Sequence, residues 1–180
     1  EAGPCATAEL TRGLDLDVAI SGLGAVGAAV AGSLGLLEAR GYASLVDPER
    51  FAPENLGTYS LGDYADANGR LWKTEVAART LPNVQTTRFD MPVSEFIDLI
   101  DAGSARWPSI ALTGLDSVDA RRDAQLLWPD RLLDGATGDT MCGLHDGSTP
   151  SGACPRRLRP VPAGGPRAVE RPAHAPDSHT

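Results

Sequence analysis

A glycine-rich turn between a predicted strand and a predicted helix constrains this chain more than any other feature. Residues 22–27 read Gly-Leu-Gly-Ala-Val-Gly, directly after the run 14–21, which becomes apolar toward its end. A strand, a Gly-x-Gly-x-x-Gly turn and a helix in this order are typical of nucleotide-binding domains. Gly22 would permit the tight turn, Gly24 would let the main chain approach a phosphate, and Gly27 would let strand and helix pack closely. We therefore expect the amides that open the helix to face an anion.

The first 145 residues alternate between strand and helix patterns. Short apolar runs predict strands at 14–21, 43–46, 84–89, 110–115 and 131–134, and apolar residues at helical spacing predict helices at 26–40, 71–81, 93–100 and 119–128. Gly41 is expected to cap the first helix, and the segment after Pro48 is expected to be a loop. This alternation predicts an α/β, Rossmann-like doubly wound fold, with a mostly parallel sheet and helices on both faces. Ligands bind such sheets at the carboxyl ends of the strands.

Asp47 stands 20 residues past Gly27, at the predicted end of the second strand. In dinucleotide-binding domains a carboxylate at about this spacing accepts hydrogen bonds from ribose hydroxyls. The competing interpretation is an acidic residue at a solvated strand end. The spacing favours the ribose role.

Four further polar residues follow predicted strands or begin predicted helices: Asn55, Lys73, Asp116 and Arg121. Each also has a purely structural interpretation. Asn55 suits a turn, and Lys73 suits the first turn of a helix, although the helix dipole disfavours a cation there. Asp116 could cap the helix that follows it, and Arg121 could support Asp116 or form a surface ion pair of little energetic weight.

As an ordered set, these residues resemble the ThiF/MoeB/ubiquitin-activating (HesA/MoeB/ThiF) family of adenylyltransferases. Members show a Gly-rich loop, an Asp that closes the second strand, an Asn-Leu pair, a Lys on the next helix and an Asp-x-x-x-x-Arg after a later strand. All five recur here in that order, over about residues 14–154. The resemblance implies ATP-dependent adenylation of a carboxylate, usually the C-terminus of a ubiquitin-like protein or peptide, with release of pyrophosphate. It also implies a homodimer.

The resemblance assigns a role to each polar residue. Lys73 would offset the charge of the polyphosphate, and Asp116 would hold the Mg²⁺ that bridges phosphate oxygens. Asn55 would form hydrogen bonds near the phosphates, and Arg121 would assist at the same site. Positioning and charge stabilisation would supply the rate, because the protein performs little covalent work in such a step.

The chain also departs from the family pattern. Thr58 stands where family members commonly have an Arg shortly after Asn-Leu, and Arg50 and Arg70 are candidates to replace it. The family often has an upstream Arg that reaches across a dimer, and Arg12 is the only candidate for it ahead of the first predicted strand.

A zinc segment of the C-x-x-C type is interrupted as well. Arg157 takes the place of its second cysteine after Cys154. Cys142, Cys154 and His145 do not make a persuasive tetrahedral set, so we expect no structural zinc.

Charge and cysteine usage exclude several classes of partner. The net charge of −8 argues against a general nucleic-acid binder and against attraction to an anionic membrane. No apolar run approaches the ~18 residues that span a bilayer. The three cysteines, with no regular spacing, do not describe a disulfide framework. We expect a cytoplasmic protein whose apolar fraction of 42% is enough for one folded core.

Composition changes toward the end of the sequence. Residues 146–180 hold seven of the 14 prolines and few large aliphatic side chains. Such a segment cannot bury enough apolar surface to fold by itself. We expect an N-terminal segment at 1–13, a nucleotide-binding domain at 14–145 and a disordered tail at 146–180. A departure from an ancestral reading frame is a second hypothesis for the tail.

Two other functions fit parts of the sequence. The turn at 22–27 with Asp47 suits an NAD-dependent oxidoreductase, but no His precedes His145 to supply an acid or base for hydride transfer. The missing loop Arg, the interrupted zinc segment and the unusual tail favour a catalytically degenerate nucleotide-binding or dimerisation module.

Overall fold

In the computed structural model, which describes residues 14–127, 131–136 and 141–146, six strands form one sheet. Their order across the sheet is β3-β2-β1-β4-β5-β6. The parallel strands are β1 (Asp15–Ser21), β2 (Arg40–Val46), β3 (Val84–Phe89), β4 (Ile110–Thr113) and β5 (Arg131–Ala136). β6 (Met141–Asp146) pairs antiparallel with β5. Because the strand order reverses direction between β1 and β4, the expected doubly wound α/β fold is confirmed.

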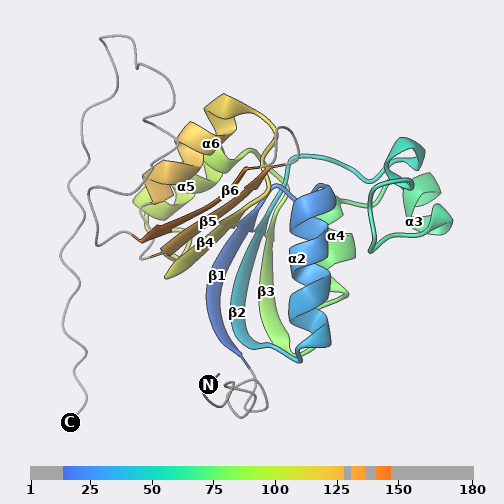
Figure 1. The fold of residues 1–180 in the computed structure, drawn as a ribbon, viewed down its shortest axis with the longest axis horizontal. Coiled ribbons are helices and arrows are strands. Elements are labelled where there is room, and N and C mark those ends of the chain that lie inside the picture. The colour runs from blue at the N-terminus through green and yellow to red at the C-terminus, as the bar shows by residue number, and fades with distance from the viewer. Residues whose placement is uncertain (1–13, 128–130, 137–140, 147–180) are drawn as a thin grey trace, which may run out of the picture.

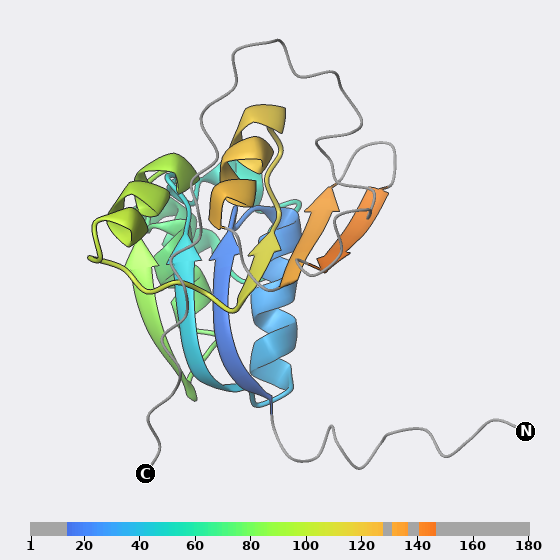
Figure 2. The ribbon, with the colours of Figure 1, turned by 90° about the vertical axis from the view of Figure 1, so that its left-hand side faces the viewer.

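Helices cover both faces of this sheet (Figures 1 and 2). One face carries α2 (Ala25–Leu36) and α4 (Lys73–Ala78), and the other carries α5 (Val93–Asp101) and α6 (Val118–Ala124). Side chains of β1 alternate between the two layers, since successive residues of a strand point to opposite faces. Val18 and Ile20 pack in the α2 layer, whereas Ala19 packs with Phe96 of α5. Both faces are buried, as expected for a parallel sheet.

The first helix is shorter than the sequence predicts. Helix α2 ends at Leu36 rather than at Arg40, and Arg40 begins β2 by pairing with Asp15 of β1. Gly41 is therefore a strand residue and not the expected helix cap. It has φ of 98°, and a Cβ there would lie 2.3 Å from the carbonyl oxygen of Leu16. Close approach of the neighbouring strand explains this glycine.

The segment after Pro48 is more ordered than the loop expected from the sequence. It contains a short 3-10 helix, η1 (Pro53–Asn55), and the helix α3 (Tyr64–Gly69). Phe51 and Tyr59 pack together with ring centroids 4.7 Å apart and form a small core with residues of α2, α3 and α4. Helix α4 (Lys73–Ala78) is shorter at both ends than the predicted helix 71–81.

The second half of the fold also differs in detail. β4 ends at Thr113 rather than 115, and α6 ends at Ala124 and continues as a 3-10 turn, η2 (Gln125–Leu127). The antiparallel β6 was not expected. Its last residue, Asp146, was assigned to the tail.

Several sequence-based expectations lie outside the described residues. These are the segment 1–13 with Arg12, and the tail from 147 onward with Cys154 and Arg157. Among the helices that the structure describes, none is long and apolar enough to cross a membrane.

Candidate nucleotide site

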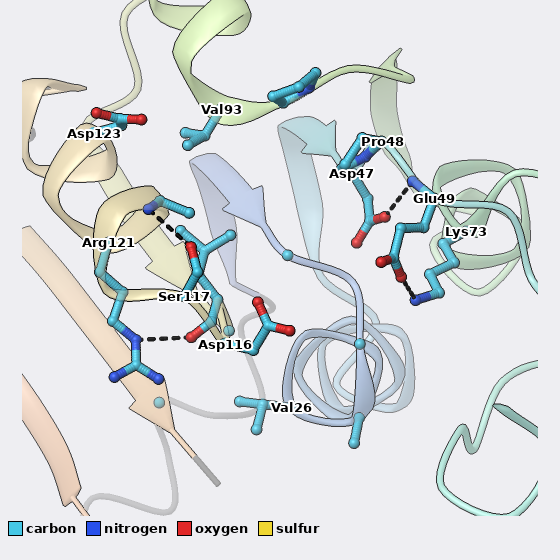
Figure 3. A pocket seen from close by; sticks show the side chains of 18 of the residues that line it. Val26, Asp47, Pro48, Glu49, Lys73, Val93, Asp116, Ser117, Arg121 and Asp123 are labelled. Atoms are coloured by element: carbon cyan, nitrogen blue, oxygen red, sulfur yellow. Dashed lines mark hydrogen bonds and ion pairs between the residues drawn. The ribbon is translucent and has the colours of Figure 1, made fainter. Parts of the chain in front are cut away.

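Loops at the carboxyl ends of the strands enclose a cavity of about 470 Å³ (Figure 3). Its walls come from the glycine-rich turn, the segment after β2, and the starts of α4, α5 and α6. Six of the residues selected from the sequence line it: Gly22, Gly24, Asp47, Lys73, Asp116 and Arg121. The cavity lies where the strand order reverses, which is the usual ligand position in an open α/β sheet.

The three glycines of the turn have different surroundings. Gly22 has φ of 80°, and a Cβ there would lie 2.9 Å from main-chain atoms of Gly114. A Cβ on Gly27 would lie 2.1 Å from the carbonyl oxygen of Gly22, so this glycine permits close packing of helix and strand. Gly24 has no heavy atom within 4 Å of the place of its Cβ, and it lines the cavity. The turn is therefore tight at two glycines and open at the third.

The N-terminus of α2 opens onto the same cavity. Gly24 is its N-cap residue, no side chain caps the helix, and its first turn contains no acidic residue. Ala25 and Val26, the first two residues of the helix, line the cavity. The first amides of a helix have no partners within it and carry the positive end of the helix dipole. This helix end can hold an anion such as a phosphate.

Asp47 fastens the glycine-rich turn to the end of β2. Its side chain is buried, Oδ2 accepts from the N–H of Leu23 over 2.6 Å, and Oδ1 accepts from the N–H of Glu49 over 2.8 Å. Burial raises the pKa of Asp47, and the two main-chain hydrogen bonds and the nearby Lys73 offset part of that rise. Carboxylate oxygens keep further lone pairs for a ligand. The buried site contradicts the alternative of a solvated strand end.

Lys73 is a buried cation at the head of α4, and it forms an ion pair with Glu49. Its side chain is only 6% exposed, whereas that of Glu49 is 66% exposed. The main chains are joined as well, because the N–H of Lys73 donates to the carbonyl oxygen of Glu49 over 3.1 Å. The hydroxyl of Tyr59 donates to the carbonyl oxygen of Lys73 over 3.3 Å. Figure 3 shows the Lys73–Glu49 pair at the edge of the cavity beside Asp47.

Asp116 follows β4 and lies at the cavity with an exposed side chain. It does not cap α6. Ser117 does so, with its hydroxyl accepting from the N–H of Ala120 over 3.0 Å. Within the part of the chain that the structure describes, no group donates a hydrogen bond to the Asp116 carboxylate. This carboxylate is therefore available to a ligand or a cation.

Arg121 stabilises the loop that carries Asp116. Its Nε donates to the carbonyl oxygen of Leu115 over 2.7 Å and lies 3.9 Å from Oδ2 of Asp134 on β5. The other oxygen of Asp134 accepts from the hydroxyl of Thr113 over 2.6 Å. These contacts match the supporting role considered for Arg121 from the sequence.

Three candidates from the segment after β2 take other positions. The Oδ1 of Asn55 accepts from the N–H of Ala52 over 3.0 Å and completes the turn of η1, and Asn55 is not among the residues that line the cavity. The guanidinium of Arg50 lies 3.8 Å from the ring centroid of Trp72 and donates to the carbonyl oxygen of Arg70 over 2.9 Å. Neither Arg50 nor Arg70 lines the cavity, so neither fills the place of the missing loop arginine.

Sequence reasoning missed Glu49, Gly114 and Asp123 as cavity residues. Glu49 follows Asp47 by two residues, and its place after a buried strand was the available signal. Gly114 follows β4, and a Cβ there would lie 2.9 Å from the amide nitrogen of Gly27. Burial and the nearby Asp119 raise the pKa of Asp123.

The charges around the cavity bear on the cofactor expected from the sequence. Four carboxylates, from Asp47, Glu49, Asp116 and Asp123, line it together with the cations of Lys73 and Arg121. No group of three metal-binding side chains occurs in the described part of the chain. Mg²⁺ in nucleotide sites is held by one or two carboxylates and by phosphate oxygens, so the Asp116 carboxylate, which has no partner in the described part of the chain, is sufficient for it. The residues present fit a magnesium nucleotide.

Solved structures share this fold at low sequence identity. E. coli MccB with ATP matches with a TM-score of 0.59 and 18% identity, covering 76% of this chain and 43% of MccB. E. coli TcdA, a tRNA N6-threonylcarbamoyladenosine dehydratase, in complex with AMP matches with a TM-score of 0.56 and 21% identity, covering 75% of this chain and 56% of TcdA. Both are ThiF/MoeB-type proteins. The chain has a ThiF/MoeB-type fold.

The solved structure of PaaA also matches this chain, with a TM-score of 0.58 and 19% identity, covering 88% of this chain and 50% of PaaA. The chain thus spans roughly half the length of the solved structures it matches. No protein-family model matches the sequence, and no curated protein matches it. The similarity is therefore one of fold.

Proposed function

We propose that this chain binds ATP with Mg²⁺ in the cavity and transfers the adenylyl group to a carboxylate, with pyrophosphate as the leaving group. One observation carries the proposal. The N-terminus of α2, which no side chain caps, the buried cation of Lys73 and the Asp116 carboxylate, which has no partner among the described residues, line one cavity. An anion site, a cation and a free metal ligand together suit a magnesium polyphosphate better than an uncharged ligand.

The proposed step is a displacement at the α-phosphorus of ATP. A carboxylate oxygen of the substrate forms a bond to this phosphorus, and the bond from the phosphorus to the oxygen that bridges to the β-phosphate breaks. The bonding electrons leave with pyrophosphate, and the product is an acyl-adenylate. Positioning and charge stabilisation provide the acceleration in such reactions.

The residues of the chain would share this work according to their charges. The amides that open α2 would hold phosphate oxygens, and Lys73 would offset negative charge on the departing pyrophosphate. Asp116 would hold Mg²⁺, which when bound neutralises charge on the phosphate oxygens. Arg121 would keep the loop with Asp116 in place through its bond to the carbonyl oxygen of Leu115. Asp47 would accept from the ribose hydroxyls with its remaining lone pairs.

The similar structures support the class of ligand and of acceptor. MccB has been crystallised with ATP and, in another crystal, with AMPCPP and MccA, and TcdA has been crystallised with AMP. We propose that the acceptor here is a C-terminal carboxylate of a peptide or of a ubiquitin-like protein. The homodimer and the cytoplasmic location stay predictions from the sequence.

Ligand binding measured by thermal unfolding tests the first half of the proposal. A ligand at about 100 times its Kd adds about 2.7 kcal/mol of stability, which shifts the Tm of a domain of this size by several degrees. We expect ATP with Mg²⁺ to raise the Tm and NAD or NADP to leave it unchanged. Stabilisation by NAD alone would favour the oxidoreductase and reject the proposal.

Exchange of labelled pyrophosphate into ATP tests the second half. Adenylation is reversible, so an active enzyme exchanges pyrophosphate into ATP when its acyl substrate is present. We expect exchange that depends on a peptide with a free C-terminal carboxylate and disappears when that carboxylate is amidated. ATP binding without exchange across a panel of such peptides and ubiquitin-like proteins would identify the chain as a degenerate nucleotide-binding module.

A further inference from the structure

We propose that Glu49 is a positioning residue that occupies the ammonium group of Lys73 in the free protein and competes with the nucleotide phosphates for it. The proposal rests on the proposed function in that it takes the ligand of the cavity to be a polyphosphate. Glu49 and Lys73 both line the cavity, and their side chains form an ion pair there. The cation that the phosphates require therefore already has an anionic partner.

Burial determines which member of the pair moves. The side chain of Lys73 is 6% exposed, and that of Glu49 is 66% exposed. A buried ammonium without a partner is costly, whereas an exposed carboxylate returns to water at little cost. Lys73 therefore stays in place, and the Glu49 carboxylate turns away when a phosphate arrives.

The main chain of Glu49 is fixed on both sides. Its N–H donates to Oδ1 of Asp47 over 2.8 Å, and its carbonyl oxygen accepts from the N–H of Lys73 over 3.1 Å. Only the side chain has to move. Because Asp47 also binds the N–H of Leu23, these hydrogen bonds connect the glycine-rich turn to the Lys73–Glu49 pair.

The charge of a ligand determines whether it displaces Glu49 from Lys73. An ammonium has three donor hydrogens and could in principle serve two anions, but a carboxylate and a polyphosphate side by side repel each other. Asp47 adds a further negative charge close to both Lys73 and Glu49. A ligand with several negative charges displaces Glu49, and an uncharged nucleoside leaves the pair intact. Glu49 thus lowers the affinity of the site for polyphosphates and leaves its affinity for uncharged nucleosides unchanged.

The test compares ATP and adenosine binding to full-length variants by calorimetry, with Mg²⁺ held constant. Glu49→Gln should tighten ATP binding roughly three- to tenfold and leave adenosine binding unchanged. This is the scale expected when a partly exposed ion pair, and the repulsion between its carboxylate and the phosphates, are removed. Glu54→Gln is the matched control, because Glu54 is an exposed glutamate of the same segment that does not line the cavity. It should leave both affinities unchanged. Unchanged or weaker ATP binding by Glu49→Gln would overturn the proposal.

A second background separates competition from simple repulsion. If Glu49 competes with ATP for Lys73, the increase in ATP affinity caused by Glu49→Gln should largely vanish in a protein that also carries Lys73→Gln. An equal gain in both backgrounds would mean that Glu49 acts on ATP directly, and the inference would be wrong. If Glu49→Gln binds ATP more tightly but the protein shows no pyrophosphate exchange, this inference stands and adenylation is rejected. If neither the parent nor Glu49→Gln bound ATP, both would be rejected.

Discussion

The N–H of Leu23 donates to Oδ2 of Asp47 over 2.6 Å, and this bond joins the glycine-rich turn to the end of the neighbouring strand across 24 residues of sequence. The acceptor is 5% exposed, so the bond is shielded from water. Asp47 thereby shapes the turn before any ligand arrives. A residue expected to hold a ribose is also part of the architecture that forms the phosphate site.

Replacement of Asp47 by Asn should therefore affect stability as well as binding. Asn offers one acceptor oxygen where Asp offers two, so the N–H of either Leu23 or Glu49 loses its partner. We expect the free energy of unfolding to fall by about 1–3 kcal/mol, the usual result of an unsatisfied buried donor. Urea unfolding of the parent and the variant measures this loss. An unchanged unfolding midpoint would show that the two hydrogen bonds contribute nothing net.

Gly24→Val tests whether a phosphate lies against the open glycine. The valine side chain meets no heavy atom of the protein within 4 Å at its Cβ, so the fold should survive with a loss of about 1 kcal/mol or less from the poorer N-cap. The same branched side chain would fill the space over the N-terminus of α2 and should reduce ATP affinity at least tenfold.

Gly57→Val is the matched control for this variant. Gly57 also has open space at the place of its Cβ, but it does not line the cavity. Calorimetric titration with ATP should give the parental affinity for Gly57→Val. Equal affinities in both valine variants would place the phosphates away from Gly24.

Asp116→Asn tests the proposed magnesium ligand. Ser117 is the N-cap of α6, so this change removes a charge without removing a cap, and stability should stay within about 0.5 kcal/mol of the parent. Pyrophosphate exchange should fall by about 100-fold or more, the scale for loss of a charge-stabilising group. Asp119→Asn is the control, because Asp119 is an exposed carboxylate of the same helix that does not line the cavity. If Asp116→Asn keeps the parental rate of pyrophosphate exchange, Asp116 is not the magnesium ligand.

The ion pair of Asp66 and Arg79 predicts a component of acid sensitivity. Burial alone would raise the pKa of Asp66, but the Arg79 guanidinium 2.7 Å away and the N–H of Asp63 outweigh burial and hold it below its ordinary value of 3.8. A lowered pKa in the folded state stabilises the protein above the unfolded pKa, and this contribution is lost as pH falls through the folded value.

Arg79→Gln should therefore be less stable than the parent at neutral pH and lose less stability on acidification. Urea unfolding at several pH values between 7 and about 3 measures both effects. Arg88→Gln is the control, because the Arg88–Glu75 pair is 40% and 38% exposed at its two side chains and should contribute little. Parallel pH profiles for the parent and Arg79→Gln would contradict the prediction.

The sequence alone was sufficient to predict the α/β fold and the edge of the sheet where the site forms. Apolar strands alternating with helices admit few arrangements, and the carboxyl ends of parallel strands meet at one edge. Asp47 and Asp116 follow two such strands, and Lys73 begins a helix that returns to the same edge. Their convergence followed from topology, which requires no knowledge of individual contacts.

The local limits of several elements depended on tertiary contacts. The pattern of α2 continued to Arg40 in the sequence, but pairing with β1 drew Arg40 and Gly41 into β2. The segment after Pro48 has the prolines of a loop, yet Phe51 and Tyr59 bury against three helices and give it a core of its own. Long-range packing overrides local preference in both places.

The partners of the polar side chains were decided only by the tertiary structure. The family resemblance assigned Asn55 to the phosphates, but in the fold the side-chain oxygen of Asn55 accepts from the N–H of Ala52. The sequence showed no partner for Lys73, whereas the fold places Glu49 beside it. Periodicity determines which face of a helix or strand a residue occupies, and topology determines at which edge of the sheet the residue lies. Which group fills its hydrogen-bonding capacity depends on distances of a few ångströms between segments far apart in the chain, and only the packed structure sets those distances.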